Sequence, residues 1–395
     1  MKLRYPDYYE KFQCIADRCE DTCCAGWEID IDDDSYKYYM SVEGEFGEKL
    51  RSHIKEYTGE EGDVYESHGF QLGEDRRCPF LDERNLCHIY RELGEDALCY
   101  VCTYTPRNFL EYGGAREVSL SASCPEAGRL IFGNPEKIKW IEKEIEGELD
   151  IEENDEELAL AEVILFARNE AIRILQNRSL SIEDRIVSFL HYAEEVQECL
   201  NAGQEDRIRK IDTEEYITAT EKWRKQYQSE MAAAEGYEYF LQRMCSFTAL
   251  SSVNREWEMF LKKIQSRYIQ PDEGRIFYER DMAQLKNIIV SQGREYEYEH
   301  LLVYYAFMCQ ARCVDDYDFV GKAKFITASF LMIRDMDMVC MVEKEGEFTP
   351  EDRQKIARIY AKEVEHSEEN LDYLSEECLF EEAYELCNLC KSVYL

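Results

Sequence analysis

The sequence predicts a mainly α-helical protein in which a small, metal-stapled, cysteine-rich N-terminal domain precedes an irregular helical bundle. Nine of the seventeen cysteines lie in the first third of the chain, together with most of the glycines and prolines. Beyond Pro135, only Pro271 and Pro350 interrupt long stretches in which apolar residues recur at helical spacing. We therefore expect two domains, over residues 1–134 and 135–395.

Within residues 1–134 the composition indicates loops and short elements. Gly113-Gly114 marks a turn, and residues 117–123 alternate as a short β-strand does. A small, loop-rich segment of this kind commonly depends on a bound metal for its fold. We expect its cysteines to supply the ligands.

The remainder of the chain predicts helices. Residues 154–177 carry apolar side chains at helical spacing with charges between them. Ser181, with an acid three residues later, is typical of a helix start and predicts a helix to about residue 201. Thr349-Pro350 followed by two acids is another start. Further helices are expected near residues 214–235, 237–268, 280–313, 318–340 and 368–392.

The net charge of −37 limits the classes of partner. Phosphate backbones would be repelled, so we expect no nucleic acid to bind. The charge favours a basic, lysine-presenting protein partner or simply a solvated acidic surface. No window of about 18 apolar residues is present, so no membrane-spanning segment is expected.

The N-terminal segment has neither the apolar region nor the cleavage site of a signal peptide. We therefore expect a cytoplasmic protein. Thiols in the cytoplasm stay reduced, so clustered cysteines there indicate a metal site rather than a disulfide framework.

The N-terminal cysteines form a dense constellation. Four of them follow a C-x4-C-x3-C-C pattern and five more follow within a hundred residues: Cys14, Cys19, Cys23, Cys24, Cys78, Cys87, Cys99, Cys102 and Cys124. A helical turn would place Cys19 and Cys23 on one face, whereas the side chains of Cys23 and Cys24 would diverge by about 100°. Cys23 and Cys24 would then serve different metals, or only one of them would be a ligand.

Ligation by thiolates alone suits Zn²⁺ or an iron–sulfur cluster. The spacing differs from that of a common zinc ribbon. His88 and His68 are possible minor ligands, although a surface position or a supporting contact is the favoured interpretation for each. The later cysteines, including the Cys387-x2-Cys390 pair, lie in apolar helical patterns and are expected to pack in the core.

Several short motifs in the first third together resemble one known family. They are Cys14-Ile-Ala-Asp-Arg-Cys-Glu-Asp-Thr-Cys-Cys-Ala-Gly-Trp27, Cys78-Pro-Phe-Leu81, Leu86-Cys-His-Ile-Tyr90, Leu93-Gly-Glu95, Cys102-Thr-Tyr-Thr-Pro-Arg107 and Ser123-Cys-Pro-Glu-Ala-Gly-Arg-Leu130. This set resembles the flagellin lysine-N-methylases of flagellated bacteria. It is more distantly similar to a wider family of zinc- or iron-chelating proteins.

The resemblance implies transfer of a methyl group from S-adenosylmethionine to lysine side chains of flagellin, with a [4Fe-4S] cluster in the protein. The matching metal-site cysteines are Cys14, Cys19, Cys23, Cys24, Cys78, Cys87, Cys102 and Cys124. Cys99 stands where the pattern requires no cysteine and ranks lowest. One cluster needs four thiolates, so eight candidates leave either a second metal site or four cysteines that are not ligands.

The way in which S-adenosylmethionine would bind is open. No G-x-G-x-x-G loop of a doubly wound domain is present, and an open iron position could hold the donor's amino and carboxylate groups. A carboxylate or a tyrosine would receive the lysine proton. Tyr90 and Tyr104 lie within the motifs, with packing as their favoured role, and Trp27 would cap the metal site or face a sulfonium. The alternative interpretation is a non-enzymatic zinc- or iron-binding protein.

Overall fold

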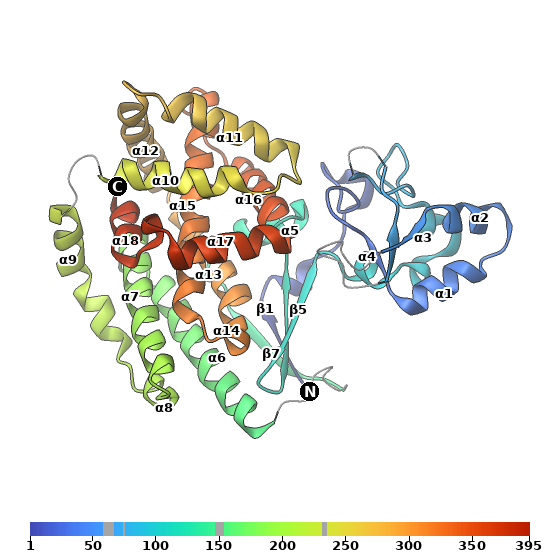
Figure 1. Ribbon diagram of the computed structural model, residues 1–395, viewed down its shortest axis with the longest axis horizontal. Coiled ribbons are helices and arrows are strands. Elements are labelled where there is room, and N and C mark those ends of the chain that lie inside the picture. Colours follow the sequence, from blue (N-terminus) through green and yellow to red (C-terminus); the bar gives the residue numbers. More distant parts are fainter. Residues whose placement is uncertain (58–66, 74–75, 147–153, 231–234) are drawn as a thin grey trace.

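The computed structural model describes residues 1–57, 67–73, 76–146, 154–230 and 235–395. Most of these residues are helical, as predicted. Figure 1 shows a large helical body with a sheet along one side, and a smaller lobe that projects from the sheet end of the body. We call the smaller part, residues 13–106, the small lobe.

A four-stranded sheet joins the small lobe to the helical body. Its order is β5-β6-β1-β7, with β1 parallel to β6 and antiparallel to β7. The strands are β1 (Lys2–Pro6), β5 (Arg107–Tyr112), β6 (Ala115–Leu120) and β7 (Trp140–Glu144). The hairpin between β5 and β6 turns at Gly113-Gly114, where both residues have positive φ, so the predicted turn is confirmed. A strand follows it as predicted, but it ends at Leu120 instead of residue 123.

The small lobe has a hydrophobic core of its own. A three-stranded sheet is made of β2 (Asp30–Ile31), β4 (His68–Phe70) and β3 (Ile54–Glu56), and helices of the described part of the lobe pack beside it. These helices are α1 (Asp33–Ser41), α2 (Gly44–Ser52), α3 (His88–Leu93) and α4 (Tyr100–Tyr104). The core includes Tyr39, Phe70 and Phe80 together with the cysteines Cys78 and Cys99.

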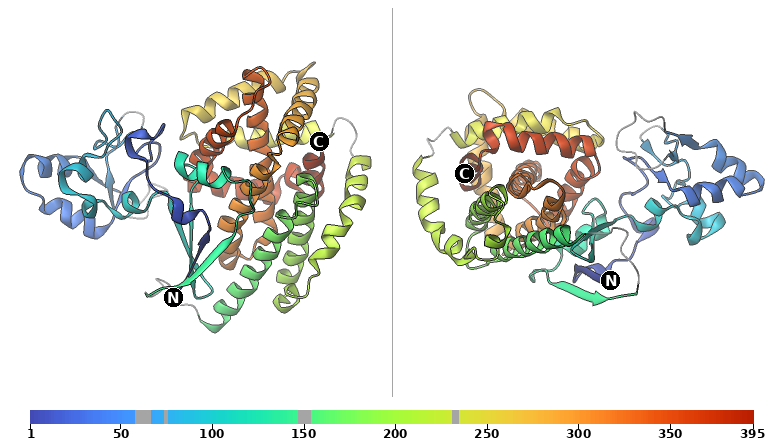
Figure 2. Two further views of the ribbon diagram at one scale, coloured as in Figure 1. Left: turned by 180° about the vertical axis from the view of Figure 1, so that it is seen from behind. Right: turned by 60° about the horizontal axis from the view of Figure 1, so that its bottom comes forward.

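The helical body is built around one long helix, α15 (Phe319–Glu343). It packs against α7, α13, α16 and α17, and the right view of Figure 2 shows these helices enclosing it. The α-helices of the described part of the body other than α15, these four included, are α5 (Pro125–Phe132), α6 (Asp155–Leu175), α7 (Ile182–Asn201), α8 (Glu205–Ile208), α9 (Thr213–Glu230), α10 (Glu235–Ala249), α11 (Arg255–Tyr268), α12 (Gly274–Ser291), α13 (Glu295–Cys309), α14 (Cys313–Asp316), α16 (Pro350–Val364), α17 (Glu368–Phe380) and α18 (Leu386–Tyr394). In the described part of the chain, none of these helices has the length and apolar character needed to cross a membrane.

Capping signals located two helices correctly, and apolar spacing located a third. α6 begins at a capping box on Asn154, and α16 begins at one on Thr349 with Pro350 in its first turn. The Ser181 hydroxyl accepts a hydrogen bond from the Asp184 amide at the start of α7. In each case a short polar side chain satisfies amides that the first turn leaves free.

Three predicted helices are each divided in two, so their predicted extents were wrong. The range 237–268 holds α10 and α11, because the Asn254 side chain accepts a backbone amide and starts a second helix. The range 280–313 is broken at Gly293, whose φ of 64° is left-handed. The range 368–392 is divided between α17 and α18. Apolar spacing continues across each short turn, so periodicity alone does not reveal the break.

The two hydrophobic cores divide the chain differently from the compositional boundary. The core of the helical body includes Tyr8, Leu120, Ala127 and Ile131, which all lie before residue 134. The core of the small lobe runs from Ile29 to Cys99. Whether residues 1–134 and 135–395 behave as separate domains stays a prediction.

Candidate functional site

The thiols of the small lobe are gathered in its core. Cys78 and Cys99 are buried, and Cys24, Cys87 and Cys102 are half-buried. The Cys102 thiol donates a hydrogen bond to Cys99, which raises the pKa of Cys102 well above its ordinary value and lowers that of Cys99. Burial and the neighbouring Cys24 and Cys78 act on the pKa of Cys102 in the same upward direction. Cysteines from distant segments thus lie near one another.

Three further cysteines extend this group toward the helical body. Burial raises the pKa of Cys124 to about 11, with smaller contributions from the nearby Cys23 and Cys19. The Cys23 thiol, on an exposed residue, hydrogen-bonds to that of Cys24, and this contact raises its pKa. Residues 19–24 are not helical and the two thiols are in contact, so the divergence expected of Cys23 and Cys24 was wrong.

Helix starts position several of these cysteines. Cys87, Cys99 and Cys124 are the residues immediately before α3, α4 and α5, and each has an extended backbone. Pro125 in the first turn of α5 favours this backbone at Cys124, as expected for a Cys-Pro step. The Asp32 carboxylate fixes the start of α4 by accepting the Tyr100 amide at 2.7 Å.

The surroundings of Cys14 and Cys99 differ from what their ranks as predicted metal ligands suggest. Cys14 is exposed, and no contact in the described part of the chain joins it to another cysteine. Its role as a ligand stays a prediction. Cys99 ranked lowest, yet it is buried against Cys102. The C-x2-C spacing of Cys99 and Cys102 was the signal that could have raised its rank.

The gathered thiols fit a thiolate-bound metal or cluster in their chemistry. Among the described residues, however, no group of three or more His, Cys, Asp or Glu side chains stands in position to hold a metal ion. His88 contacts Lys49 and His68 stacks on Tyr36, so both histidines have other neighbours. Metal binding by the predicted cysteines stays a prediction.

Charged side chains join the small lobe to the helical body beside these cysteines. Asp21 lies between Arg358 and Lys362 of α16, with its carboxylate 2.6 Å from the Lys362 amine. Although burial opposes the effect, these two cations lower the pKa of Asp21. The neighbouring Glu20 accepts hydrogen bonds from Arg129 of α5. We call this contact region the lobe junction.

Trp27 adds an aromatic contact to the lobe junction. Its ring stacks on the imidazole of His366, with centroids 4.5 Å apart and planes 20° apart. The Lys362 amine lies 5.4 Å from the same ring centroid. Tyr90 and Tyr104, the other aromatic candidates, are surface residues of the small lobe.

A hydroxyl-rich network lies directly behind Trp27 and His366. The Glu365 carboxylate accepts hydrogen bonds of 2.8 Å from both Tyr304 and Tyr305 of α13, and Ser121 Oγ lies 3.1 Å from it. His366 Nε2 lies 2.9 Å from Ser123 Oγ, next to Cys124. Burial raises the pKa of Glu365 and lowers that of His366 to about 4, so the imidazole is neutral at physiological pH.

Sequence reasoning did not find this network. Its members come from the segment after β6, from α13 and from the residues that follow α16. The chain holds 28 tyrosines and 84 acidic residues, among which they are not distinctive. The adjacent tyrosines and the adjacent Glu365-His366, in a chain with six histidines, were the available signals.

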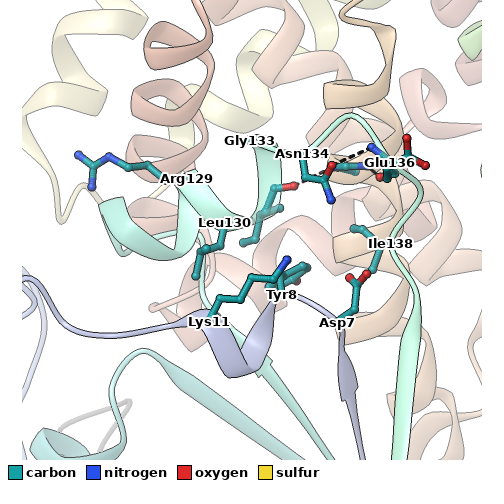
Figure 3. Close-up of a pocket in the computed structure, with 11 residues that line it drawn as sticks. Asp7, Tyr8, Lys11, Arg129, Leu130, Gly133, Asn134, Glu136 and Ile138 are labelled. Atoms are coloured by element: carbon teal, nitrogen blue, oxygen red, sulfur yellow. Dashed lines mark hydrogen bonds between the residues drawn. The ribbon is translucent and has the colours of Figure 1, made fainter.

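A cavity of about 230 Å³ lies on another side of α5. Figure 3 shows Asp7, Tyr8 and Lys11 along one side of it and the segment Gly133–Glu136 on the other. His300 of α13 also lines it and contacts the carbonyl oxygens of Ile131 and Glu136. His300 lies one turn before Tyr304, so α13 borders both the cavity and the hydroxyl network. Amine, carboxylate and amide groups in the lining suit a small polar ligand.

Comparison with known proteins relates the helical body to one family. The model of the FliB lysine N-methylase C-terminal domain matches residues 168–391. This range contains Tyr304, Tyr305, Glu365 and His366, whereas the nine clustered cysteines precede it.

Curated relatives carry related names. The chain is 32% identical over 144 residues to the lysine-N-methylases of Salmonella typhimurium (strain LT2) and Salmonella choleraesuis (strain SC-B67), covering 35% of each chain. It is 28% identical over 144 residues to the flagellar biosynthetic protein FliU of Salmonella muenchen, covering 35% of this chain and 81% of that one. The match thus spans about a third of the length of the two lysine-N-methylases. No solved structure matches. Because the family model covers more than half of the sequence, the chain belongs to the FliB lysine N-methylase family.

Proposed function

We propose that this protein transfers methyl groups from S-adenosylmethionine to lysine side chains of flagellin. The observation that carries the proposal is the family match over residues 168–391, the part of the chain that supplies the tyrosines and Glu365 at the lobe junction. The relatives' names, lysine-N-methylase and flagellar biosynthetic protein, support lysine as the acceptor and a flagellar protein as the substrate.

The proposal includes a [4Fe-4S] cluster on the cysteines of the small lobe, with zinc as the alternative. Cys24, Cys78, Cys99 and Cys102 would hold it after some rearrangement, because they lie near enough to shift the pKa of Cys102 together and four thiolates satisfy one cluster. A bound cluster with an open iron position would supply a binding site for the amino and carboxylate groups of the methyl donor. Anaerobic purification tests this: iron and sulfide in roughly equal amounts support the cluster, and zinc supports the alternative.

The charge of the chain supports a lysine-presenting partner. A net charge of −37 attracts basic surfaces over a distance of about one Debye length, near 8 Å at physiological salt. Encounter with flagellin lysines should therefore slow as salt rises.

The test is transfer of labelled methyl from S-adenosylmethionine to purified flagellin. We expect label on native flagellin and none on flagellin whose lysines have been acetylated beforehand. A protein that takes up metal but neither binds S-adenosylmethionine nor labels flagellin would instead be the non-enzymatic metal-binding protein.

A further inference from the structure

Glu365 is a sheltered carboxylate for which the described residues provide no cationic partner. Among them, no Lys, Arg or His side chain forms an ion pair with it. Two other sheltered carboxylates in the body do have one: Glu117 pairs with Arg168 and Glu299 with Arg185. A carboxylate away from water normally requires a compensating charge. Glu365 is therefore suited to a cation brought by a ligand.

The hydroxyl groups around Glu365 leave one acceptor position on it. An ionised carboxylate offers about four lone-pair positions. Tyr304 and Tyr305 each donate to one of its oxygens, and Ser121 Oγ stands at 3.1 Å. These contacts fix the orientation of the carboxylate. An approaching ammonium group would supply both a further donor and a compensating charge.

Glu365 is partly exposed and is the chain neighbour of His366, on which Trp27 stacks. Glu365 and His366 are half-buried, whereas Tyr304 and Tyr305 behind them are buried. The half-buried ring of Trp27 lies on His366, so an aromatic ring stands one residue along the chain from Glu365. A lysine side chain suits this arrangement, because its methylene stem packs on apolar surface while its amine remains free to bond.

We propose that Glu365 binds the ε-ammonium group of the substrate lysine and accepts its proton. The inference rests on the proposed lysine methylation and assigns the residue that prepares the amine. Glu365 takes one N–H proton, which leaves a neutral amine and a carboxylic acid. The nitrogen lone pair then forms a bond to the methyl carbon of the sulfonium donor. The carbon–sulfur bond breaks with its electron pair on sulfur, giving a methylated ammonium and a thioether, and Glu365 releases its proton to water.

The surroundings of Glu365 favour this role. The titratable groups that face it are Tyr304, Tyr305 and Cys309 of α13, Tyr360 of α16 and the neighbouring His366, and Lys362 lies one turn earlier on α16. Burial raises the pKa of Glu365 toward the operating pH, which strengthens it as a base. Below that pKa the carboxyl is protonated, so the methylation rate should fall as the pH is lowered through it.

A matched control lies two residues away. Glu363 is also buried and has no ion-pair partner among the described residues, but it is fully enclosed and accepts the Val253 amide instead of tyrosine hydroxyls. Burial raises the pKa of Glu363 to about 8, so its carboxyl is protonated in most molecules at pH 7. Glu363→Gln therefore changes a neighbouring carboxyl without changing the proposed base.

The experiment compares wild type, Glu365→Gln, Glu365→Asp and Glu363→Gln, each checked for its melting temperature. The first measurement is binding of n-butylammonium by NMR titration. We expect Glu365→Gln to lose this binding, while the wild type and Glu363→Gln keep it. Absence of binding by the wild type, or unchanged binding by Glu365→Gln, overturns the inference whatever the methylation result.

The second measurement is kcat against pH with flagellin and S-adenosylmethionine. General-base catalysis contributes about 10²–10⁴-fold, so kcat of Glu365→Gln at pH 7 should fall by at least about 100-fold and recover toward pH 10, where free amine is present. Glu365→Asp should retain part of kcat, and Glu363→Gln all of it. If Glu365→Gln keeps the kcat and the pH profile of the wild type, the inference about Glu365 is overturned and the proposed function is not. Failure of the wild type to methylate flagellin, with n-butylammonium binding intact, overturns the proposed function instead.

Discussion

The indole of Trp27 in the small lobe stacks on the imidazole of His366 at the end of α16, with 4.5 Å between ring centroids. This contact joins the cysteine segment to the part of the chain that matches the methylase family. It also places the turn that carries Cys23 and Cys24 beside the hydroxyl network around Glu365. The lobe junction therefore links the segment of the proposed ligand Cys24 to the segment of the proposed base Glu365.

Trp27→Ala should weaken the lobe junction. Aromatic pairs contribute about 0.5–1.5 kcal/mol beyond the area that they bury, so we expect a loss of about 1–3 kcal/mol in the free energy of unfolding. Trp27→Phe keeps a ring and should lose less. Urea denaturation compares the variants, and equal stability of Trp27→Ala and wild type would contradict a structural role for the stack.

The ion pairs of Asp21 should make the lobe junction sensitive to acid. The folded-state pKa of Asp21 lies below its ordinary value, so its stabilising contribution is present above about pH 4 and is lost as the pH falls through the folded pKa. Asp21→Asn removes this contribution and leaves Arg358 and Lys362 without their shared partner. Limited proteolysis across pH 3–7 should show acid-dependent opening in the wild type, and the Asp21→Asn variant should be cleaved faster than wild type at pH 7. Equal cleavage of the two proteins at pH 7 would contradict this role.

Cys102 should be required for metal binding, because it contacts Cys99 in the core of the small lobe. We expect Cys102→Ser to reduce iron, or zinc, per chain after anaerobic purification. Cys245→Ser is the matched control, since Cys245 is an exposed thiol on α10. Cys14→Ser in the same assay tests whether that exposed cysteine is a ligand. Full metal content in Cys102→Ser would contradict the proposed set.

Breaking the buried ion pair between Arg353 and Asp337 should lower the free energy of unfolding more than breaking an exposed ion pair does. Both side chains are fully buried, and Arg353 also lies 4.0 Å from the centroid of the Tyr298 ring. Arg353→Met leaves a carboxylate without its partner, which costs about 3–5 kcal/mol. Chemical denaturation measures the loss. The double variant Arg353→Met/Asp337→Leu should recover part of it, because no uncompensated charge then remains.

Local signals in the sequence predicted much of the fold. The caps at Ser181 and Thr349-Pro350 lie within a few residues of the helices that they start, so they could be identified without tertiary information. The pairing of β1 with β6 joins Lys2 to Ala115, and no local pattern encodes such a distant contact. The sheet that connects the two parts was missed for this reason.

The candidate site was predictable only in part, for a related reason. The cysteines were recognisable because an uncommon residue type is concentrated in a short segment. Tyr304 and Glu365 are common residue types 61 positions apart, and the packing of α13 beside the end of α16 brings them together. Only the folded chain reveals their contact with each other and with the lobe junction.

The most direct test of the proposed function is the mass of flagellin after incubation with the anaerobically purified protein and S-adenosylmethionine. We predict a gain of whole methyl groups, located by peptide mapping on lysine side chains and absent when S-adenosylmethionine is omitted. An unchanged flagellin mass, with metal bound and the protein folded, would contradict the assignment.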